Sequence, residues 1–294
     1  MKFDDSHLQK YKKLIEGITT KELEGHKSIA VALSAGIDSA MILFCLLDLG
    51  YKVTAFTFHR EGVISTDFKL SKENCKILGV DFVEVIVPNK IDTNRLIHIM
   101  RDLKVKNKSA VECTYTMDYV WEKMQEHNVD IAFSGIGNDS LYGSSKKANI
   151  HFGKTLELNQ LFRRNNFMST GTYQFNGQVK AWSNLCAEKG IKLSVPIWDR
   201  TIYDFLNPFT FKELNTPTQK TPCWNLYPDY VEKTTIKKHE NLQCGDSQIR
   251  ELFEPLLLDK VANPNNKKSM LAFWKDWQER LSANSKLESI IDLN

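Results

Sequence analysis

The sequence lacks the features typical of membrane proteins, secreted proteins and proteins with a structural zinc site. Its six cysteines include no Cys-x-x-Cys pair, so we expect no structural zinc ribbon, and scattered cysteines of this kind usually serve as small buried hydrophobes. The longest apolar run, near residues 40–47, is far too short to cross a bilayer. The polar start Met-Lys-Phe-Asp-Asp-Ser has no signal-peptide core. We therefore expect a cytoplasmic protein with no membrane partner.

The sequence also lacks an excess of charge of one sign. Its 39 Lys and Arg residues face 36 Asp and Glu residues, for a net charge of +3. This balance gives no bulk electrostatic reason to bind nucleic acid. A local basic cluster keeps nucleic acid open as a partner, and it comprises Lys146, Lys147, Lys154, Arg163 and Arg164.

Strand-like and helix-like segments alternate through the first half of the chain. Short apolar, β-branched runs predict strands at 28–33, 52–58, 81–87 and 130–133. Apolar residues at helical spacing predict helices at 5–25, 38–49, 66–78, 92–103 and 113–127. This alternation predicts an α/β fold, with a parallel sheet covered by helices on both faces.

The alternation fades after residue 150. Residues 151–180 read as a substrate loop or lid, and helices are expected at 178–189, 200–206, 246–259 and 268–282. We therefore expect an α/β core at 1–150 with an N-terminal covering helix. A mostly helical region at 151–294 would pack on that core.

The stretch Val31–Ala40 joins an expected strand to an expected helix through small residues, Ser34-Ala35-Gly36. The first N–H groups of a helix lack internal partners and the helix dipole favours negative charge there, so such a turn can bind an anion. The stretch lacks the Gly-Lys-Ser/Thr ending of a Walker loop and the three spaced glycines of a dinucleotide site. An ordinary strand-to-helix turn remains the alternative for this loop taken alone.

This loop resembles the Ser-Gly-Gly-x-Asp-Ser loop of the PP-loop ATP pyrophosphatases. That resemblance implies cleavage of ATP between its α and β phosphates, with a carboxylate or carbonyl activated as an adenylate. Ala35 stands where the family usually has glycine, and a methyl group is tolerated there if the backbone stays in a common φ/ψ region. This sequence lacks the cysteine pairs on which several PP-loop relatives depend, including tRNA thiolases and deazaguanine nitrile synthases.

Further landmarks follow in order and extend the resemblance over residues 31–247. Residues 134–143, Ser-Gly-Ile-Gly-Asn-Asp-Ser-Leu-Tyr-Gly, are similar to the second loop of asparagine synthetases. Residues 195–200, Val-Pro-Ile-Trp-Asp-Arg, resemble that family's Val-Pro-Phe-Leu-Asp segment, and Lys220 lies about twenty residues downstream, where the family carries a lysine. Lys238 with Gln243–Ser247 resembles a later Lys…Gln-x-Gly-Ser element. The chain therefore resembles the synthetase domain of the asparagine synthetase family and is also similar to β-lactam synthetase.

The resemblance implies a PP-loop, adenine nucleotide alpha hydrolase-like fold and a set of site residues. The loop is expected to bind the β and γ phosphates of ATP, and the backbone near Leu33 and Phe58 is expected to contact adenine. The residues expected to hold ATP are Leu33, Ser34, Ala35, Gly36, Asp38, Ser39, Phe58 and Gly135. Asp38 and Asp139 are the expected ligands of Mg²⁺, which prefers carboxylate and phosphate oxygens. The expected catalytic residues are Lys220, Lys238 and Asp139, with the lysines stabilising charge on the departing phosphates or a tetrahedral intermediate. A solvated surface charge is the alternative for either lysine.

One departure from the family affects the expected chemistry. Ile136 stands where the family's second loop has glutamate, and Ser140 replaces the following one. A carboxylate there serves ammonia handling or amine deprotonation, so its loss disfavours simple asparagine synthesis. If another general base is needed, the candidates are Glu112, Asp118, Glu157 and Tyr142, and the sequence does not choose among them.

A family glutaminase domain begins at a catalytic cysteine after the initiator methionine, where this sequence has Lys2. The resemblance therefore implies nitrogen from ammonia, a separate glutaminase or a substrate amine. The expected function is an ATP-dependent carbon–nitrogen ligase that forms an amide through an acyl-adenylate and releases AMP and pyrophosphate. The alternatives are a PP-loop enzyme that modifies a nucleobase or tRNA, and a nucleotide-binding protein without chemistry.

Overall fold

The computed structural model describes residues 2–253 except residues 106, 170, 171, 174, 176, 238–241, 243 and 244. Lys238, the expected helix at 268–282 and the second half of the one expected at 246–259 lie outside the described residues. Within the described residues, no helix is both long enough and apolar enough to cross a membrane.

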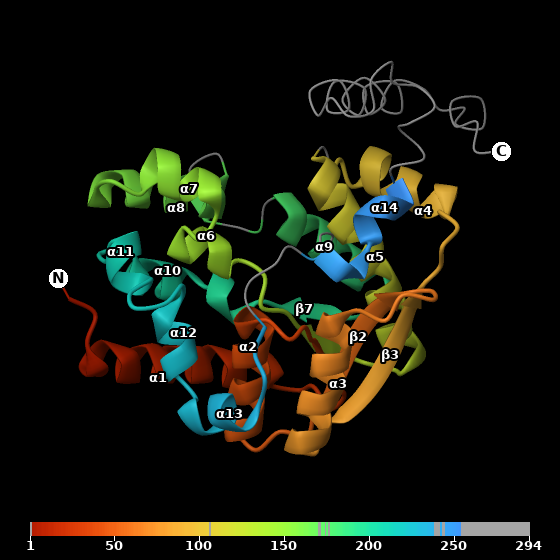
Figure 1. The fold of residues 1–294 in the computed structure, drawn as a ribbon, viewed down its shortest axis with the longest axis horizontal. Helices are drawn as coiled ribbons and strands as arrows, with labels where there is room; N and C mark the ends of the chain where they lie inside the picture. The colour runs from red at the N-terminus through yellow and green to blue at the C-terminus, as the bar shows by residue number, and fades with distance from the viewer. Residues whose placement is uncertain are drawn as a thin grey trace.

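A five-stranded parallel sheet forms the centre of the molecule (Figure 1). Its strands, in spatial order, are β3 (Asp81–Val87), β2 (Thr54–Arg60), β1 (Ile29–Ala32), β4 (Ile131–Phe133) and β7 (Lys192–Ser194). The first four confirm the strands expected from the sequence. The sequence pattern did not predict β7, because three residues that begin with an exposed lysine form no apolar run.

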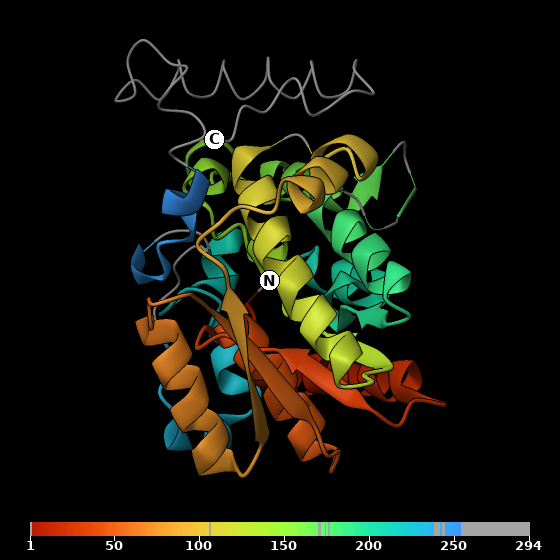
Figure 2. The same ribbon diagram turned by 90° about the vertical axis from the view of Figure 1, so that its right-hand side faces the viewer.

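Helices cover both faces of this sheet, which confirms the predicted fold class. Figure 2 shows α3 (Thr66–Leu78) and α5 (Lys108–Glu126) on opposite sides of β2 and β3, and each helix contacts both strands. On the α5 side, α9 (Gly177–Glu188) packs against α5 and β7. A short helix, α4 (Thr93–Ile97), continues into a π-helical turn at His98–Asp102 and precedes α5.

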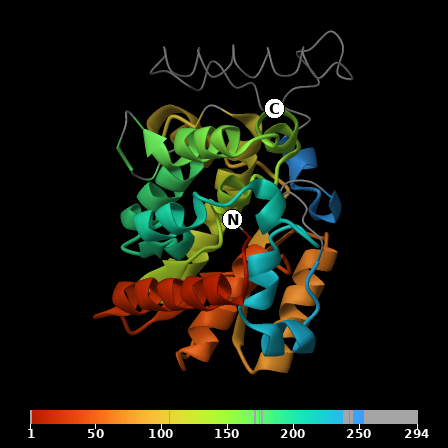
Figure 3. The same cartoon turned by 90° about the vertical axis from the view of Figure 1, so that its left-hand side faces the viewer.

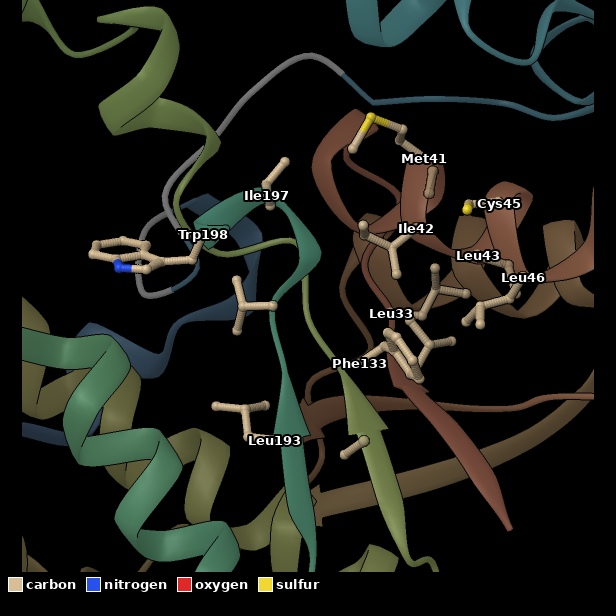
Figure 4. Packing of buried hydrophobic residues seen from close by; sticks show 14 of the residues in the cluster. Leu33, Met41, Ile42, Leu43, Cys45, Leu46, Phe133, Leu193, Ile197 and Trp198 are labelled. Carbon is tan, nitrogen blue, oxygen red and sulfur yellow. The ribbon is translucent and has the colours of Figure 1, made fainter. Parts of the chain in front are cut away.

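The helix that follows β1, α2 (Ile37–Asp48), lies in the core. Nine of its twelve residues are buried, as expected for a helix that is apolar on nearly all sides. Figure 4 shows Ile42 and Leu43 of α2 beside Leu33 and Phe133 at the ends of β1 and β4. The long helix α1 (Asp5–Leu23) packs against α2 and α10 (Arg200–Leu206) and runs across one side of the molecule (Figure 3). This packing holds α2 against the ends of β1 and β4.

Short helices dominate the chain after β4. They are α6 (Asn138–Tyr142), α7 (Lys146–Phe152), α8 (Leu156–Phe167), α10 (Arg200–Leu206), α11 (Phe211–Leu214), α12 (Thr221–Asn225), α13 (Pro228–Lys233) and α14 (Ile249–Phe253). Two 3₁₀ turns, Pro196–Trp198 and Gly245–Ser247, and an antiparallel pair, β5 (Met168–Ser169) and β6 (Thr172–Tyr173), complete the described elements.

The expectation of a loop over 151–180 is wrong for residues 156–167, which form α8. Thr155 caps this helix by accepting a hydrogen bond from the Leu158 N–H. Its buried stripe consists of Asn159, Arg163 and Phe167, which recur at helical spacing. Because two members of the stripe are polar, the apolar periodicity of the sequence did not reveal the helix.

Arg163 does not belong to the basic surface cluster considered from the sequence. Its side chain is buried and donates hydrogen bonds to the carbonyl oxygens of Leu141 (2.7 Å), Phe209 (2.8 Å) and Asn207 (3.2 Å). Burial lowers the pKa of Arg163 to about 10. The guanidinium therefore binds α8 to the end of α6 and to the segment after α10, and it offers no charge to a nucleic acid.

Candidate active site

The two loops singled out in the sequence follow neighbouring strands, β1 and β4. Ser34–Gly36 leads from β1 into α2, and Ser134–Gly137 leads from β4 into α6. Ligands of parallel α/β sheets bind at the carboxyl ends of the strands. The fold therefore brings both loops to the edge of the sheet where a ligand is expected.

Hydrogen bonds between two serines shape the first loop. The Ser34 N–H donates to Ser39 Oγ at 2.9 Å, and the two hydroxyl oxygens lie 2.9 Å apart. The Gly36 N–H donates to Ser34 Oγ at 3.2 Å, and the Ser39 hydroxyl donates to the Ser34 carbonyl at 3.0 Å. These hydroxyls therefore hold the turn at the start of α2, and their predicted contact with phosphate stays a prediction.

Ala35 is held from both flanks of the loop. Its N–H donates to Asp67 Oδ1 at 2.9 Å, and its carbonyl accepts from the Lys237 N–H at 2.7 Å. The methyl group is buried, and the residue has no positive φ, which confirms that alanine is tolerated at this point. Sequence reasoning missed Asp67 and Lys237, because both contacts join segments far apart in the chain.

The second loop contacts the first through Gly135. A Cβ atom at Gly135 would lie 2.3 Å from the carbonyl carbon and oxygen of Asp38 and 2.6 Å from the Ser39 nitrogen. No side chain fits between these backbones, so only glycine allows the approach. The contact places Asp139, in the first turn of α6, opposite Asp38, in the first turn of α2.

The Lys220 ammonium lies between these two carboxylates. Its Nζ is 2.5 Å from Asp38 Oδ2 and 2.7 Å from Asp139 Oδ1, and the side chain is only 1% exposed. Burial alone would lower the pKa of Lys220, but the charges of Asp38 and Asp139 outweigh it and raise the pKa above its ordinary value. The alternative of a solvated surface lysine is therefore wrong for Lys220, and the structure brings together three of the predicted residues.

Asn215 holds the backbone of Lys220, which has the left-handed conformation at φ +60°. The Lys220 N–H donates to Asn215 Oδ1 at 2.8 Å. The Asn215 amide group donates to the carbonyls of Phe211 at 2.6 Å and Tyr142 at 2.8 Å. Non-glycine residues rarely adopt this conformation, which costs on the order of 1–2 kcal/mol. Asn215 therefore joins the lysine-bearing turn to α6 and α11, a role with no signal in the sequence.

Replacing Asn215 by alanine is expected to lower kcat about 10- to 100-fold while leaving the KM for ATP nearly unchanged. Lys220 is a predicted catalytic residue, and small misplacements of such a group cost about that much. Steady-state kinetics would measure both constants. Thr216→Ala is the matched control, since the Thr216 hydroxyl donates to the Lys212 carbonyl on the exposed side of the same turn. An Asn215→Ala enzyme with the wild-type kcat would show that this amide does not position Lys220.

Two cavities meet at Asp38. The inner cavity, of about 270 Å³, is lined by Ala32, Leu33, Ser34, Asp38, Ser39, Phe56, Phe58, Cys113, Met117, Val120, Ser134, Gly135, Ile136, Asp139, Gln178, Trp182 and Leu242. The outer cavity, of about 350 Å³, is lined by Gly36, Ile37, Asp38, Thr218, Gln219, Lys220, Trp224 and Lys237. The inner lining is largely apolar, whereas the outer lining combines two lysines with the start of α2.

The predicted nucleotide residues divide between these cavities. Leu33, Ser34, Asp38, Ser39, Phe58 and Gly135 line the inner cavity, and Gly36 lines the outer one together with Asp38. Ala35 lines neither cavity. The backbone of Leu33 is bonded to β2, because its N–H donates to the Phe56 carbonyl and its carbonyl accepts from the Thr57 hydroxyl, each at 2.9 Å. Sequence reasoning missed that α5 and α9 line the inner cavity, because their apolar residues have the helical spacing of an ordinary core helix.

Lys237 lines the outer cavity, while Lys238, the lysine chosen from the sequence, lies outside the described residues. The Lys237 ammonium is 3.4 Å from Asp246 Oδ1. Asp246 Oδ2 in turn accepts from the Thr66 N–H at 2.6 Å. These contacts bind the segment after α13 to the start of α3, beside the first loop.

The four candidate general bases do not line either cavity. Asp118 lies 2.5 Å from both Arg95 and Lys189, and Glu112 is paired with Lys108. The Tyr142 hydroxyl donates to the Tyr11 hydroxyl at 3.2 Å, and burial raises the pKa of Tyr142 well above its ordinary value. Glu157 is exposed in the first turn of α8. The structure therefore brings none of these four to the cavities beside Lys220.

The donor set beside Lys220 fits Mg²⁺ only in company with other oxygen ligands. Among the described residues, no group of three or more His, Cys, Asp or Glu side chains could hold a metal ion. Asp38 and Asp139 supply two carboxylates, and Mg²⁺ in phosphate-transfer sites is commonly bound by one or two carboxylates plus substrate phosphates. The predicted pair therefore has the chemistry of such a shared site.

Comparisons with known proteins place the site in a family context. The family model for asparagine synthase matches residues 10–219, which include both loops. A 7-cyano-7-deazaguanine synthase from Methanocaldococcus jannaschii is 31% identical over 103 residues, covering 32% of this chain and 43% of that protein. The chain thus spans less than half the length of that relative.

Two solved structures share weak similarity with the chain. One is a predicted subunit of a tRNA methyltransferase from Methanocaldococcus jannaschii, at 15% identity and a TM-score of 0.34, covering 72% of this chain and 94% of that one. The other is NMN synthetase from Francisella tularensis, at 13% identity and a TM-score of 0.34, covering 81% and 98%.

Proposed function

The chain belongs to the asparagine synthase family, and from this membership we propose that it forms a carbon–nitrogen bond through an acyl-adenylate. It is an ATP-using enzyme of the PP-loop type. The proposed reaction takes ATP, a small carboxylate and an amine or ammonia, and yields an amide, AMP and pyrophosphate. A separate glutaminase is one proposed source of the ammonia, and the cytoplasm is the proposed location.

The observation that carries the proposal is the buried ammonium of Lys220 at the meeting point of two chemically different cavities. The apolar lining of the inner cavity suits a purine nucleoside. The outer cavity suits the β and γ phosphates, because it combines Lys220 and Lys237 with the start of α2, and a helix N-terminus favours anions. This arrangement supports a bond cleavage close to Lys220, between a nucleoside monophosphate and pyrophosphate.

The proposed first step is attack of the substrate carboxylate oxygen on the α-phosphorus, with pyrophosphate leaving. In the second step the nitrogen nucleophile attacks the acyl carbon, the C–O bond to the phosphate breaks and expels AMP, and the proton that the nitrogen loses passes to solvent. Lys220 would hydrogen-bond the oxygens that gain negative charge, and its burial excludes the water that would weaken this interaction. Mg²⁺, held by Asp38, Asp139 and phosphate oxygens, would supply further neutralisation of phosphate charge.

Ile136 bears on the nucleophile. Its side chain lines the inner cavity, where the family's glutamate would place a carboxylate. An isoleucine can neither accept a proton nor attract an ammonium ion. We therefore propose that the nitrogen reaches the acyl-adenylate as an uncharged amine, and that the substrate differs from that of an asparagine synthetase.

The test is product analysis with a panel of carboxylates, each tested with ammonia and with amines. AMP and pyrophosphate should appear together, and a carboxylate labelled with ¹⁸O should transfer one labelled oxygen to AMP. Asp38→Asn should abolish both products, whereas Asp48→Asn at the other end of α2 is the matched control that should retain them. Formation of ADP and phosphate would overturn the proposal.

A second candidate is activation of a nucleobase carbonyl or carboxylate, favoured by the local similarity to 7-cyano-7-deazaguanine synthase. It predicts that pyrophosphate release depends on a deazapurine, a nucleoside or an RNA. The burial of Arg163 removes one member of the basic cluster that would support RNA binding. Adding each class of acceptor to the same pyrophosphate assay separates the two candidates.

A further inference from the structure

A single ammonium pairs with two carboxylates in the site, and it lies where a cation between Asp38 and Asp139 would lie. Lys220 Nζ is 2.5 Å from an oxygen of one and 2.7 Å from an oxygen of the other. The carboxylates come from two different loops, which meet at Gly135. Lys220 therefore joins the two loops and offsets part of the negative charge of their carboxylates.

We propose that Lys220 is an internal counter-ion that excludes a divalent cation from Asp38 and Asp139 until nucleotide binds. Metal and nucleotide would then enter the site as one complex rather than in sequence. This inference rests on the proposed function, because it assigns the two carboxylates to the metal of the nucleotide complex.

Burial of the lysine explains why a free metal ion would not displace it. The side chain is 1% exposed, so a displaced ammonium would remain in a dry environment without its counter-ions, which is strongly unfavourable. A second cation placed beside it would also be repelled at short range. The two carboxylates are more accessible, with 24% and 44% of their side chains exposed, so access is not what keeps the metal away.

The nucleotide changes this balance, because its phosphates carry the negative charge that the ammonium needs. Lys220 lines the outer cavity, which we assign to the β and γ phosphates. Transfer of the ammonium from carboxylate to phosphate oxygens keeps it paired and releases the carboxylates for the metal. A lysine suits this exchange, since its flexible stem carries three rotatable donors.

The experiment measures Mn²⁺ binding in the absence of nucleotide and of any acyl substrate, by calorimetry or by the EPR signal of the free ion. The wild-type protein should show no specific Mn²⁺ site. Lys220→Met should gain one site that binds Mn²⁺ at least about tenfold more tightly than any residual binding by the wild-type protein, and Mn²⁺ should raise the Tm of the variant. Wild-type protein that binds Mn²⁺ as tightly as the variant would overturn the proposal.

The double variant Lys220→Met/Asp139→Asn is the matched control. It should lose the gained site, whereas retention of that site would show that the metal binds elsewhere and would overturn the proposal.

If Lys220→Met does not fold, the wild-type protein still tests the proposal. Mg²⁺ alone should leave its Tm unchanged at constant ionic strength, and Mg²⁺ with a non-hydrolysable ATP analogue should raise its Tm. A Tm increase with Mg²⁺ alone would overturn the proposal. No turnover is measured, so the result is independent of whether an acyl-adenylate forms.

Discussion

Replacing Lys220 by alanine is expected to abolish the proposed formation of AMP and pyrophosphate and to lower the free energy of unfolding by about 2–4 kcal/mol. The variant would leave Asp38 and Asp139 facing each other without the ammonium that lies between them. Removing one partner of a fully buried ion pair costs about 3–5 kcal/mol. The partial exposure of both carboxylates reduces this cost, because solvent screens their repulsion.

The pH dependence of this stability difference has a definite sign. The pKa of Lys220 is raised above its ordinary value of 10.5, because the two carboxylates outweigh its burial. The stabilising contribution of the ammonium is therefore fully present below pH 10.5 and is lost as the pH rises through the folded-state pKa. The wild-type protein and the variant should differ at neutral pH and converge in strongly alkaline solution.

Urea unfolding at several pH values and the pyrophosphate assay would measure the two effects. Lys212→Ala is the matched control, because Lys212 is an exposed lysine on α11, just before the same turn. That variant should match the wild-type protein in both assays. A Lys220→Ala enzyme with wild-type turnover would remove this lysine from the proposed chemistry.

The sequence indicated the order of elements in the first half of the fold because most of them carry their own local signal, although α5 begins at Lys108 and not at residue 113 as predicted. For α3 and β3 the predicted bounds match the structure residue for residue. A serine cap before α3, a glycine after it and a β-branched run in β3 mark these ends independently of tertiary contacts. The later elements lack such signals: α8 buries polar side chains, and β7 has only three residues.

The candidate site likewise contains residues that the sequence predicted and residues that it did not. The convergence of Asp38, Asp139 and Lys220 followed from a resemblance across widely separated landmarks, and no local pattern would have indicated that Lys220 is buried. The residues that support them escaped prediction. Asn215 acts through its amide group, and Lys237 binds the first loop through its backbone N–H. Such contacts depend on where distant segments meet, which periodicity and spacing do not encode.

Replacing Gly135 by alanine is expected to destabilise the protein by about 3 kcal/mol and to abolish ATP binding. The new Cβ would lie 2.3 Å from the carbonyl of Asp38 and 2.6 Å from the Ser39 nitrogen. The obstructing atoms are backbone at the start of α2, so no side-chain rotation relieves the contact and the two loops must separate. Separation would move Asp139 away from Asp38, so that the Lys220 ammonium could no longer contact both carboxylates.

Calorimetric titration with an ATP analogue and urea unfolding would test this prediction, with Gly17→Ala as the matched control. Gly17 lies within α1, and a Cβ there would meet no heavy atom within 4 Å. Alanine is favoured over glycine inside a helix, so that variant should be more stable by about 0.5–1 kcal/mol and bind the analogue normally. Both variants add one methyl group, so a difference between them in stability or affinity reflects how much space each position has for that group. Wild-type affinity in Gly135→Ala would show that the contact between the loops is not needed for the nucleotide site.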